Sequence, residues 1–232
     1  MKPIILGNGL LGSCLHELTN WRVISRSVNG IDFTQPKSYK KLIDNNNFDT
    51  IINCIAYTKT SDNTKKQHWE TNYIGTINLV DMCNKLQKKL VHISTEYIYA
   101  QSVTPASEDD IPIHYNNWYT YTKILSDAYV EARSNNFLTI RASFKPNPFP
   151  WEEAWTDLKG NFDYVDVIAK IIIKLIERNA HGIFNVGTEQ KTMFELAQRT
   201  RPEVRKSKRK DDVLPKNICM NLEKMYDFLS NQ

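Results

Sequence analysis

The sequence predicts an α/β protein: a doubly wound parallel sheet of the Rossmann type with a small C-terminal lobe. Short apolar runs alternate with longer amphipathic ones through the first 142 residues, the pattern of a parallel sheet covered by helices on both faces. The motif Gly7-Asn8-Gly9-Leu10-Leu11-Gly12 directly follows an apolar run near the N-terminus. A glycine turn between a strand and a helix lets the backbone approach a pyrophosphate group closely.

The elements of this sheet follow from the apolar runs in chain order. Strands are expected at residues 3–6, 21–25, 30–32, 50–55, 90–94 and 138–142. Helices are expected at residues 10–18, 39–45, about 63–86 and 119–134. Because crossovers between parallel strands are right-handed, these elements should wind into one sheet with helices on both sides.

The pattern changes at residue 143. Residues 145–150 read Lys-Pro-Asn-Pro-Phe-Pro, which can sustain neither a helix nor a central strand. We therefore expect a dinucleotide-binding domain over residues 1–142 and a small substrate-binding lobe over residues 143–232, some segments of which return to the sheet. In the second part we expect a buried helix at 165–176 and a strand at 182–186. A capping box of Thr192 and Glu195 should start a further helix.

The composition excludes several classes of protein. A net charge of +4 over 232 residues is modest, so neither nucleic acid nor an anionic membrane is indicated as a partner. Four scattered cysteines and five histidines show no ligand spacing, which predicts no disulfide framework and no metal site. No apolar run approaches the length of a membrane span. We expect a cytoplasmic protein.

The end of the second strand bears on the choice of cofactor. Where an acidic residue would accept hydrogen bonds from a ribose 2′-hydroxyl, the sequence has Ser25 and Arg26. A guanidinium suits a 2′-phosphate, so NADPH is favoured over NADH. Asp32 lies 20 residues after Gly12, the usual count for a ribose-binding acid, but a strand intervenes, and we expect it beside the adenine.

A second motif predicts hydride chemistry. Tyr119 and Lys123 lie four residues apart in an expected helix, so their head groups share one face. An ammonium beside a phenol should lower the pKa of the phenol, which can then donate a proton to a carbonyl oxygen. Thr95 follows the strand at 90–94, at the sheet edge where ligands of open parallel sheets bind, and its hydroxyl could orient that oxygen.

With these motifs the chain resembles the extended short-chain dehydrogenase/reductase family, and within it the dTDP-4-dehydrorhamnose reductases and related nucleotide-sugar 4-keto reductases. The matching motifs span residues 4–142: residues 7–12, 51–58, 71–75, 91–99 and 119–123. The resemblance implies that Thr95 binds the reacting oxygen, Tyr119 is the general acid and Lys123 supports it. Expected cofactor contacts are Gly7, Asn8, Gly9, Leu10, Leu11, Gly12, Ser25, Arg26, Asp32, Phe33, Cys54, Ile55, Ala56, Tyr57, Asn72, Tyr119 and Lys123. Expected substrate contacts are Thr58, Thr95, Glu96 and Tyr97.

The same resemblance separates reaction types. Dehydratases of this superfamily carry an Asp-Glu pair after the threonine, whereas this chain has Glu96 and Tyr97, which favours plain reduction of a nucleotide-linked 4-keto-6-deoxysugar by NADPH. Two alternatives stay open. The chain is shorter than the roughly 280–300 residues usual in the family, which suits a cofactor-binding regulatory subunit, and a nucleotide-sugar epimerase would use the same triad. A homodimer through the long helices is a further expectation.

A basic run lies in the second part of the chain. Seven Arg and Lys residues fall between positions 199 and 210, with Glu203 as the one acid among them. Three interpretations compete: a solvated surface segment, a clamp on a substrate diphosphate, or a nucleic-acid contact. Charge runs are usually solvated, and no interleaved aromatic residues suggest base stacking. Trp151 and Trp155 are expected to cover the small lobe.

Overall fold

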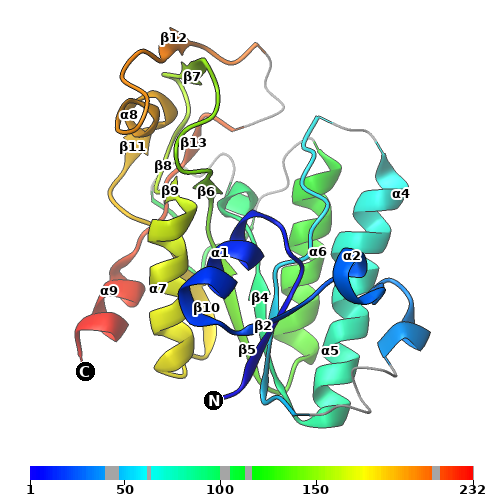
Figure 1. Cartoon of the computed structure of the whole chain (residues 1–232). Coiled ribbons are helices and arrows are strands. Elements are labelled where there is room, and N and C mark those ends of the chain that lie inside the picture. The colour runs from blue at the N-terminus through cyan, green and yellow to red at the C-terminus, as the bar shows by residue number, and fades with distance from the viewer. Residues whose placement is uncertain (40–46, 62–63, 100–104, 113–116, 211–214, 232) are drawn as a thin grey trace.

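The computed structural model describes residues 1–39, 47–61, 64–99, 105–112, 117–210 and 215–231. Its centre is a parallel sheet with the strand order β10-β5-β4-β3-β1-β2 (Figure 1). The strands are β1 (Pro3–Leu6), β2 (Arg22–Ile24), β3 (Thr50–Asn53), β4 (Lys89–Ile93), β5 (Phe137–Arg141) and β10 (Gly182–Asn185). The predicted doubly wound parallel sheet is confirmed.

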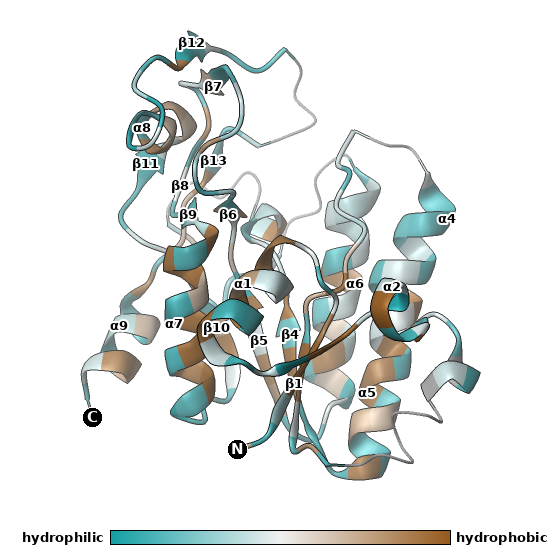
Figure 2. Ribbon diagram, in the orientation of Figure 1, coloured by the Kyte–Doolittle hydropathy of each residue, from teal (hydrophilic) through white to brown (hydrophobic). Residues whose placement is uncertain are grey.

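Helices cover both faces of this sheet. One face carries α1 (Leu10–Thr19), α7 (Val165–Glu177) and α9 (Glu223–Ser230), and the other carries α4 (Lys65–His68), the π-helical segment η2 (Trp69–Ile74), α5 (Gly75–Leu86) and α6 (Trp118–Arg133). The apolar sides of α5 and α7 turn toward the strands (Figure 2). Burial of these two apolar layers supplies the main stabilisation of the fold.

The side chains of β1 show how one strand serves both layers. Ile5 packs with the α1 and α7 side, whereas Ile4 and Leu6 pack with the α5 side. Successive residues of a strand point to opposite faces, so a strand buried on both faces reads as a continuous apolar run. This is why the short apolar runs of the sequence predicted the central strands well.

A small lobe sits above one end of the sheet (Figure 1). It is built from residues 149–164, 191–210 and 215–218, around an apolar core that includes Phe149, Leu158, Phe162 and Ile218. Its short elements are β7 (Glu153–Trp155), β8 (Lys159–Gly160), β9 (Asp163–Tyr164), β11 (Lys191–Thr192), α8 (Met193–Gln198), β12 (Arg205–Ser207) and β13 (Asn217–Ile218). β6 (Phe144–Lys145) pairs with β9 and connects β5 to the lobe.

Several elements beyond residue 143 belong to the sheet itself. α7 packs on its α1 face, and β10 pairs in parallel with β5. This return of later segments to the sheet agrees with the sequence prediction for 165–176 and 182–186. The predicted capping box is also present, because the Thr192 hydroxyl accepts from the backbone N–H of Glu195 and the Glu195 carboxylate accepts from that of Thr192.

The strand expected at residues 30–32 is wrong. Ser25 caps a helical turn, α2 (Arg26–Asn29), by accepting from the Val28 N–H, and Gly30 ends the turn with a φ of +67°. Since β2 is the edge strand of the sheet, the chain leaves the sheet after it, and residues 30–32 form no strand. The local capping signal outweighed the short apolar run.

Two predicted helices meet the limits of the described residues. The one expected at 39–45 lies outside them apart from its first residue, which ends the 3₁₀ turn η1 (Pro36–Tyr39). The long helix expected at about 63–86 is present from Lys65 as α4, η2 and α5 in succession. A further 3₁₀ turn, η3 (Glu96–Tyr99), follows β4.

The glycine motif forms the turn between β1 and α1. Gly7 has a φ of +96°, a conformation that side chains with a Cβ disfavour. Gly12 lies in the first turns of α1, where a Cβ would come within 2.0 Å of the Gly7 carbonyl oxygen. The two glycines therefore allow the strand and the helix to approach each other.

We expect Gly12→Ala to destabilise the protein by about 1–3 kcal/mol, because the new methyl group would force the turn and the helix apart. Gly9→Ala is the matched control, since its Cβ would meet no atom within 4 Å and its φ is −73°. Urea unfolding of the two variants checks the prediction. Equal stabilities would contradict it.

Candidate active site

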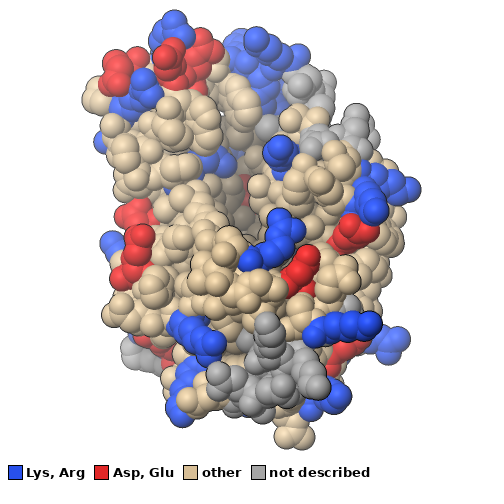
Figure 3. Space-filling model, turned by 45° about the vertical axis from the view of Figure 1, so that its right-hand side comes forward, with Lys and Arg blue, Asp and Glu red and all other residues tan. Residues whose placement is uncertain are grey.

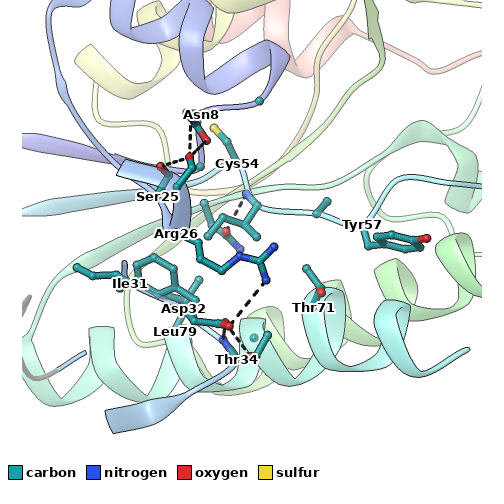
Figure 4. Close-up of a pocket in the computed structure, with 18 residues that line it drawn as sticks. Asn8, Ser25, Arg26, Ile31, Asp32, Thr34, Cys54, Tyr57, Thr71 and Leu79 are labelled. Carbon is teal, nitrogen blue, oxygen red and sulfur yellow. Dashed lines mark hydrogen bonds and ion pairs between the residues drawn. The ribbon is translucent and has the colours of Figure 1, made fainter. Parts of the chain in front are cut away.

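A cavity of about 380 Å³ opens at the carboxyl ends of β1, β2 and β3 (Figure 4). The loops that follow these three strands line it, together with one side of η2 and α5. The lining residues are Gly7, Asn8, Gly9, Ser25, Arg26, Ser27, Ile31, Asp32, Phe33, Thr34, Asn53, Cys54, Ile55, Ala56, Tyr57, Thr71, Gly75 and Leu79. This is the edge at which open parallel sheets bind their ligands.

The cavity brings most of the predicted cofactor residues together. Gly7, Asn8, Gly9, Ser25, Arg26, Asp32, Phe33, Cys54, Ile55, Ala56 and Tyr57 all line it. Leu10, Leu11, Gly12, Asn72, Tyr119 and Lys123 do not. Leu11 and Gly12 are buried under the turn, whereas Leu10 is exposed.

Sequence reasoning missed seven residues of the wall: Ser27, Ile31, Thr34, Asn53, Thr71, Gly75 and Leu79. Ser27, Ile31, Thr34 and Asn53 each lie next to a predicted contact in the sequence, so a window one residue wider would have found them. Thr71, Gly75 and Leu79 recur every four residues along η2 and α5, which is the spacing of one helix face. No local signal says which face of that helix meets the cavity.

One end of the cavity carries hydroxyl, amide and guanidinium groups. The Asn8 side-chain amide donates to Ser27 Oγ at 3.1 Å, and Ser25 Oγ lies 3.1 Å from Ser27 Oγ. Arg26 extends beside Asp32, with 4.0 Å between Nη1 and Oδ2 (Figure 4). Burial opposes ionisation of Asp32, but hydrogen bonds from Thr34 and the charge of Arg26 outweigh it and lower the pKa of that carboxyl.

Asn72 holds the opposite wall in place from behind. Its side chain accepts from the Tyr57 N–H at 2.7 Å and donates to the Tyr57 carbonyl at 3.1 Å. It also donates to Thr122 Oγ1 of α6 at 3.1 Å. The residue is buried, so it supports the loop after β3 instead of lining the cavity as the sequence analysis expected.

The carboxyl end of β4 carries the next group of predicted residues. Thr95 lies two residues after β4, and its hydroxyl faces the phenol of Tyr119 at the start of α6 as a hydrogen-bond partner. The Tyr97 ring contacts the Tyr119 ring edge to face, with 6.3 Å between centroids. The backbone N–H of Tyr97 also donates to Thr95 Oγ1 at 3.3 Å. Thr95 and Tyr119 are thus brought together as predicted.

Lys123 lies one helical turn after Tyr119 and reaches the same strand end. Its ammonium donates to the Ile93 carbonyl at 2.7 Å and lies 3.3 Å from His92 Nε2. Burial lowers the pKa of Lys123 to about 8, and the Asp127 carboxylate partly offsets this. Cys54, a residue of the cavity wall, faces the same ammonium. Lys123 therefore stands between the cavity and β4.

The expected lowering of the Tyr119 pKa by Lys123 is not what the structure shows. Burial raises the pKa of the phenol, and Glu96 adds to this whenever it is ionised, whereas the Thr95 hydroxyl acts in the opposite direction. The Lys123 ammonium instead donates to the Ile93 carbonyl and lies beside His92 Nε2. Tyr119 is therefore held as the neutral, proton-bearing form.

The predicted substrate residues divide into two groups. Thr95 and Glu96 are buried, Tyr97 is half-buried, and all three lie at the base of the small lobe. Thr58 is exposed on the loop after β3. The molecular surface is hollowed between the small lobe and the body of the sheet (Figure 3).

The family model of the RmlD substrate binding domain matches residues 1–144, which is more than half of the chain. The chain belongs to this family. The resemblance that the motifs at residues 4–142 indicated is thereby confirmed.

Individual relatives of this RmlD family member agree with that assignment. A dTDP-4-dehydrorhamnose reductase of Mycolicibacterium smegmatis is 29% identical over 129 residues, a match that covers 53% of this chain and 38% of the relative. The chain thus spans about two fifths of the length of that curated relative. A crystal structure of dTDP-4-dehydrorhamnose reductase from Bacillus anthracis in complex with NADP has a TM-score of 0.84 and 23% identity, over 97% of this chain and 91% of that one.

A more distant fold relative binds another cofactor. The Bordetella bronchiseptica enzyme WbmH in complex with NAD⁺ has a TM-score of 0.79 and 16% identity, over 97% of this chain and 91% of that one. At such identities the likeness shows that the fold is shared. The choice between the two nicotinamide cofactors has to be argued from the residues of the cavity.

In this RmlD family member each of the four arginines in the basic run lies beside an acid. Arg199 pairs with Glu189, Arg201 with Glu203, Arg205 with Glu152 and Glu153, and Arg209 with Asp157. The pairs made by Arg199, Arg201 and Arg205 are solvated, which fits the surface-segment interpretation. Arg209 is different, because its side chain is 3% exposed and its charge acts on Tyr97.

Other features of the sequence are also placed. Trp155 packs against the core of the small lobe, as expected, and Trp151 contacts Phe149 at its surface. Within the described ranges, no group of three or more His, Cys, Asp or Glu side chains could hold a metal ion. In the same part of the chain, no helix is long and apolar enough to cross a bilayer.

We expect Asn72→Ala to destabilise the protein by about 2–3 kcal/mol, because the Tyr57 backbone groups and Thr122 would lose their hydrogen-bond partner in a buried place. Asn78→Ala is the matched control one to two turns later, since its side chain makes a single hydrogen bond of 3.4 Å to the Phe33 carbonyl. Thermal and urea unfolding of both variants checks this. A larger loss in the control would refute the supporting role of Asn72.

Proposed function

We propose that this chain is an NADPH-dependent oxidoreductase that reduces the 4-keto group of a nucleotide-linked 6-deoxysugar. The observation that carries the proposal is the contact of Tyr119 with Thr95 at the end of β4, the strand beside the glycine-lined cavity, with Lys123 of the same helix facing Cys54 of the cavity wall. A proton donor beside a dinucleotide site is the arrangement that carbonyl reduction requires.

The cavity fits a dinucleotide in its details. A Cβ on Gly9 would point into open space, and Gly9 forms the N-cap of α1. A phosphate group could therefore approach the first N–H groups of that helix directly. NADPH, when bound, supplies a hydride. The exposed fraction of 82% leaves the Arg26 side chain free to swing toward a 2′-phosphate at the rim of the cavity.

The residues at the strand edge would handle the proton. Tyr119 keeps its phenolic proton because burial raises its pKa, so it can donate to a carbonyl oxygen that turns into an alkoxide. Thr95 would hold the same oxygen through its hydroxyl. Lys123, whose ammonium faces Cys54 of the cavity wall, would hold the ribose side of the cofactor. The buried surroundings strengthen each of these interactions.

The substrate class is inferred from three lines of support. The molecular surface is hollowed between the small lobe and the sheet, which is where we propose that the substrate binds (Figure 3). Glu96 stands alone where an eliminating enzyme would need an acid–base pair, because Tyr97 follows it. The matched M. smegmatis relative is named a dTDP-4-dehydrorhamnose reductase. We propose residues 1–142 as the cofactor domain, residues 143–232 as the substrate lobe, and the cytoplasm as the place of reaction.

We expect the purified protein to oxidise NADPH in the presence of a dTDP- or UDP-4-keto-6-deoxysugar, followed as loss of absorbance at the nicotinamide band. Tyr119→Phe should lower kcat about 10²–10⁴-fold, because it removes the general acid. NADPH affinity should change little in that variant.

Tyr121→Phe is the matched control on the same helix, and its kcat should stay close to that of the parent. Cofactor oxidation by no sugar of this class would refute the proposed function. A nicotinamide cofactor that stays bound through purification, without net oxidation, would instead indicate an epimerase. NADPH binding without turnover, together with co-purification of another protein, would indicate a regulatory subunit.

Arg26→Ala tests the cofactor preference. We expect the affinity for NADPH to fall about 10- to 100-fold, since a charge-assisted hydrogen bond contributes about 1.5–3 kcal/mol, with little change for NADH. Arg22→Ala, an exposed arginine of β2 outside the cavity, is the control. Calorimetric titration of both cofactors checks this, and an equal loss for NADH and NADPH would argue against a 2′-phosphate contact.

A further inference from the structure

A cluster of polar groups behind Thr95 has no role in the reaction outlined above. Glu96 is completely buried, and its Oε2 accepts a hydrogen bond from Thr95 Oγ1 at 3.3 Å. Ser143 and Lys145, which lie on and beside β6 at the entry to the small lobe, face the same carboxyl. A carboxyl group without exposed surface is costly to keep, so its position calls for an explanation.

The groups of the cluster follow one another from the phenol to the half-buried lysine, with hydrogen bonds from Thr95 to Glu96 and from Lys145 to Ser143. Tyr119 contacts the Thr95 hydroxyl, Thr95 contacts Glu96, and Ser143 stands between Glu96 and Lys145. The Lys145 ammonium lies 3.5 Å from Ser143 Oγ. Pairing of β6 with β9 in register Lys145 to Tyr164 holds the lysine in this place.

Lys123, on the cavity side of Tyr119, is poorly placed to return a proton to the phenol. Its ammonium is held by the Ile93 carbonyl and His92. The line through Thr95 and Glu96 instead leads away from the cavity toward Ser143, just before β6, and Lys145 of β6, both of which are half-buried. A proton can thus enter at Lys145 without passing through the cofactor cavity.

We propose that Glu96, Ser143 and Lys145 form a proton-return relay that restores the proton of Tyr119 through the Thr95 hydroxyl after each reduction. The inference rests on the proposed function. Once Tyr119 has given its proton to the sugar alkoxide, the phenolate takes one from Thr95, and Thr95 takes one from the Glu96 carboxyl. Glu96 recovers its proton through Ser143 from the Lys145 ammonium, which takes one from water. The net uptake is one proton, and no electrons move along the line.

The electrostatics of the cluster agree with this direction. Burial raises the pKa of Glu96, and the charge of Lys145 acts against that rise. Burial lowers the pKa of Lys145, so its ammonium gives up a proton more readily. The other groups that face the Glu96 carboxyl are Ser143, Thr95, Tyr97 and Tyr119. These groups are hydroxyls and phenols, which carry no positive charge. Lys145 is therefore the one cation facing Glu96 within the part of the chain that the structure describes.

Glu96→Gln separates proton return from the first proton transfer, because Tyr119 starts each measurement protonated. We expect the single-turnover rate of NADPH oxidation to stay within about threefold of the parent, whereas the steady-state kcat falls at least about tenfold. Small buffer acids at high concentration should restore part of the loss. Glu177→Gln, an exposed carboxylate at the end of α7, should change neither rate. A parallel fall of both rates, or no fall in kcat, would overturn the relay.

A second measurement is independent of turnover. In protein labelled with ¹³C at the glutamate carboxyl groups, Lys145→Met should raise the pKa of Glu96, because the facing cation is lost, and Lys174→Met should leave it in place. If the pKa of Glu96 in Lys145→Met equals that of the parent, the relay is overturned, whatever the activity of the variant. If the parent protein oxidises no NADPH with any of these sugars, the proposed function fails on its own, and the titration still decides the coupling.

Discussion

The buried carboxylate of Asp127 ties the helix of the candidate site to the sheet. Asp127 lies on α6, and its Oδ2 pairs with Arg141 Nε of β5 at 3.2 Å, whereas its Oδ1 lies 3.4 Å from His92 Nε2 of β4. Two neighbouring strands thus fix the rotation of α6. Removing one partner of such a buried pair typically costs about 3–5 kcal/mol. Lys123 and Tyr119 lie one and two turns before Asp127, so the same contacts set their direction.

The walls of the cavity depend on comparable ties between elements that are distant in sequence. Asn72 on η2 holds the backbone of Tyr57 after β3 and the hydroxyl of Thr122 on α6. One amide therefore links a cavity loop to the helix of the catalytic candidates. The sequence analysis expected Asn72 in the cavity from the motif at residues 71–75, and that motif says nothing of contacts 15 and 50 residues away along the chain.

Local signals predicted the fold well where they agreed with the tertiary environment. The apolar runs of β1, β3, β4 and β5 are strands because both faces of the sheet are covered, and the Thr192 capping box starts α8 as expected. The prediction of a strand at residues 30–32 was wrong, because the Ser25 cap and Gly30 turn the chain away from the sheet at its edge. The same turn of the chain brings Ser27 and Thr34 to the wall of the cavity. The periodicity of apolar residues does not predict this position.

The sequence alone determined the glycine turn, the strand and helix order, and the identity of the groups that carry protons, because these depend on residue type and on spacing within one element. The tertiary structure decided what those groups meet. It joined Thr95 to Tyr119, directed Lys123 toward Ile93 and His92, and buried Glu96 against residues that follow β5. Contacts of this kind join segments far apart along the chain, and burial shifts their pKa values in ways that spacing does not encode.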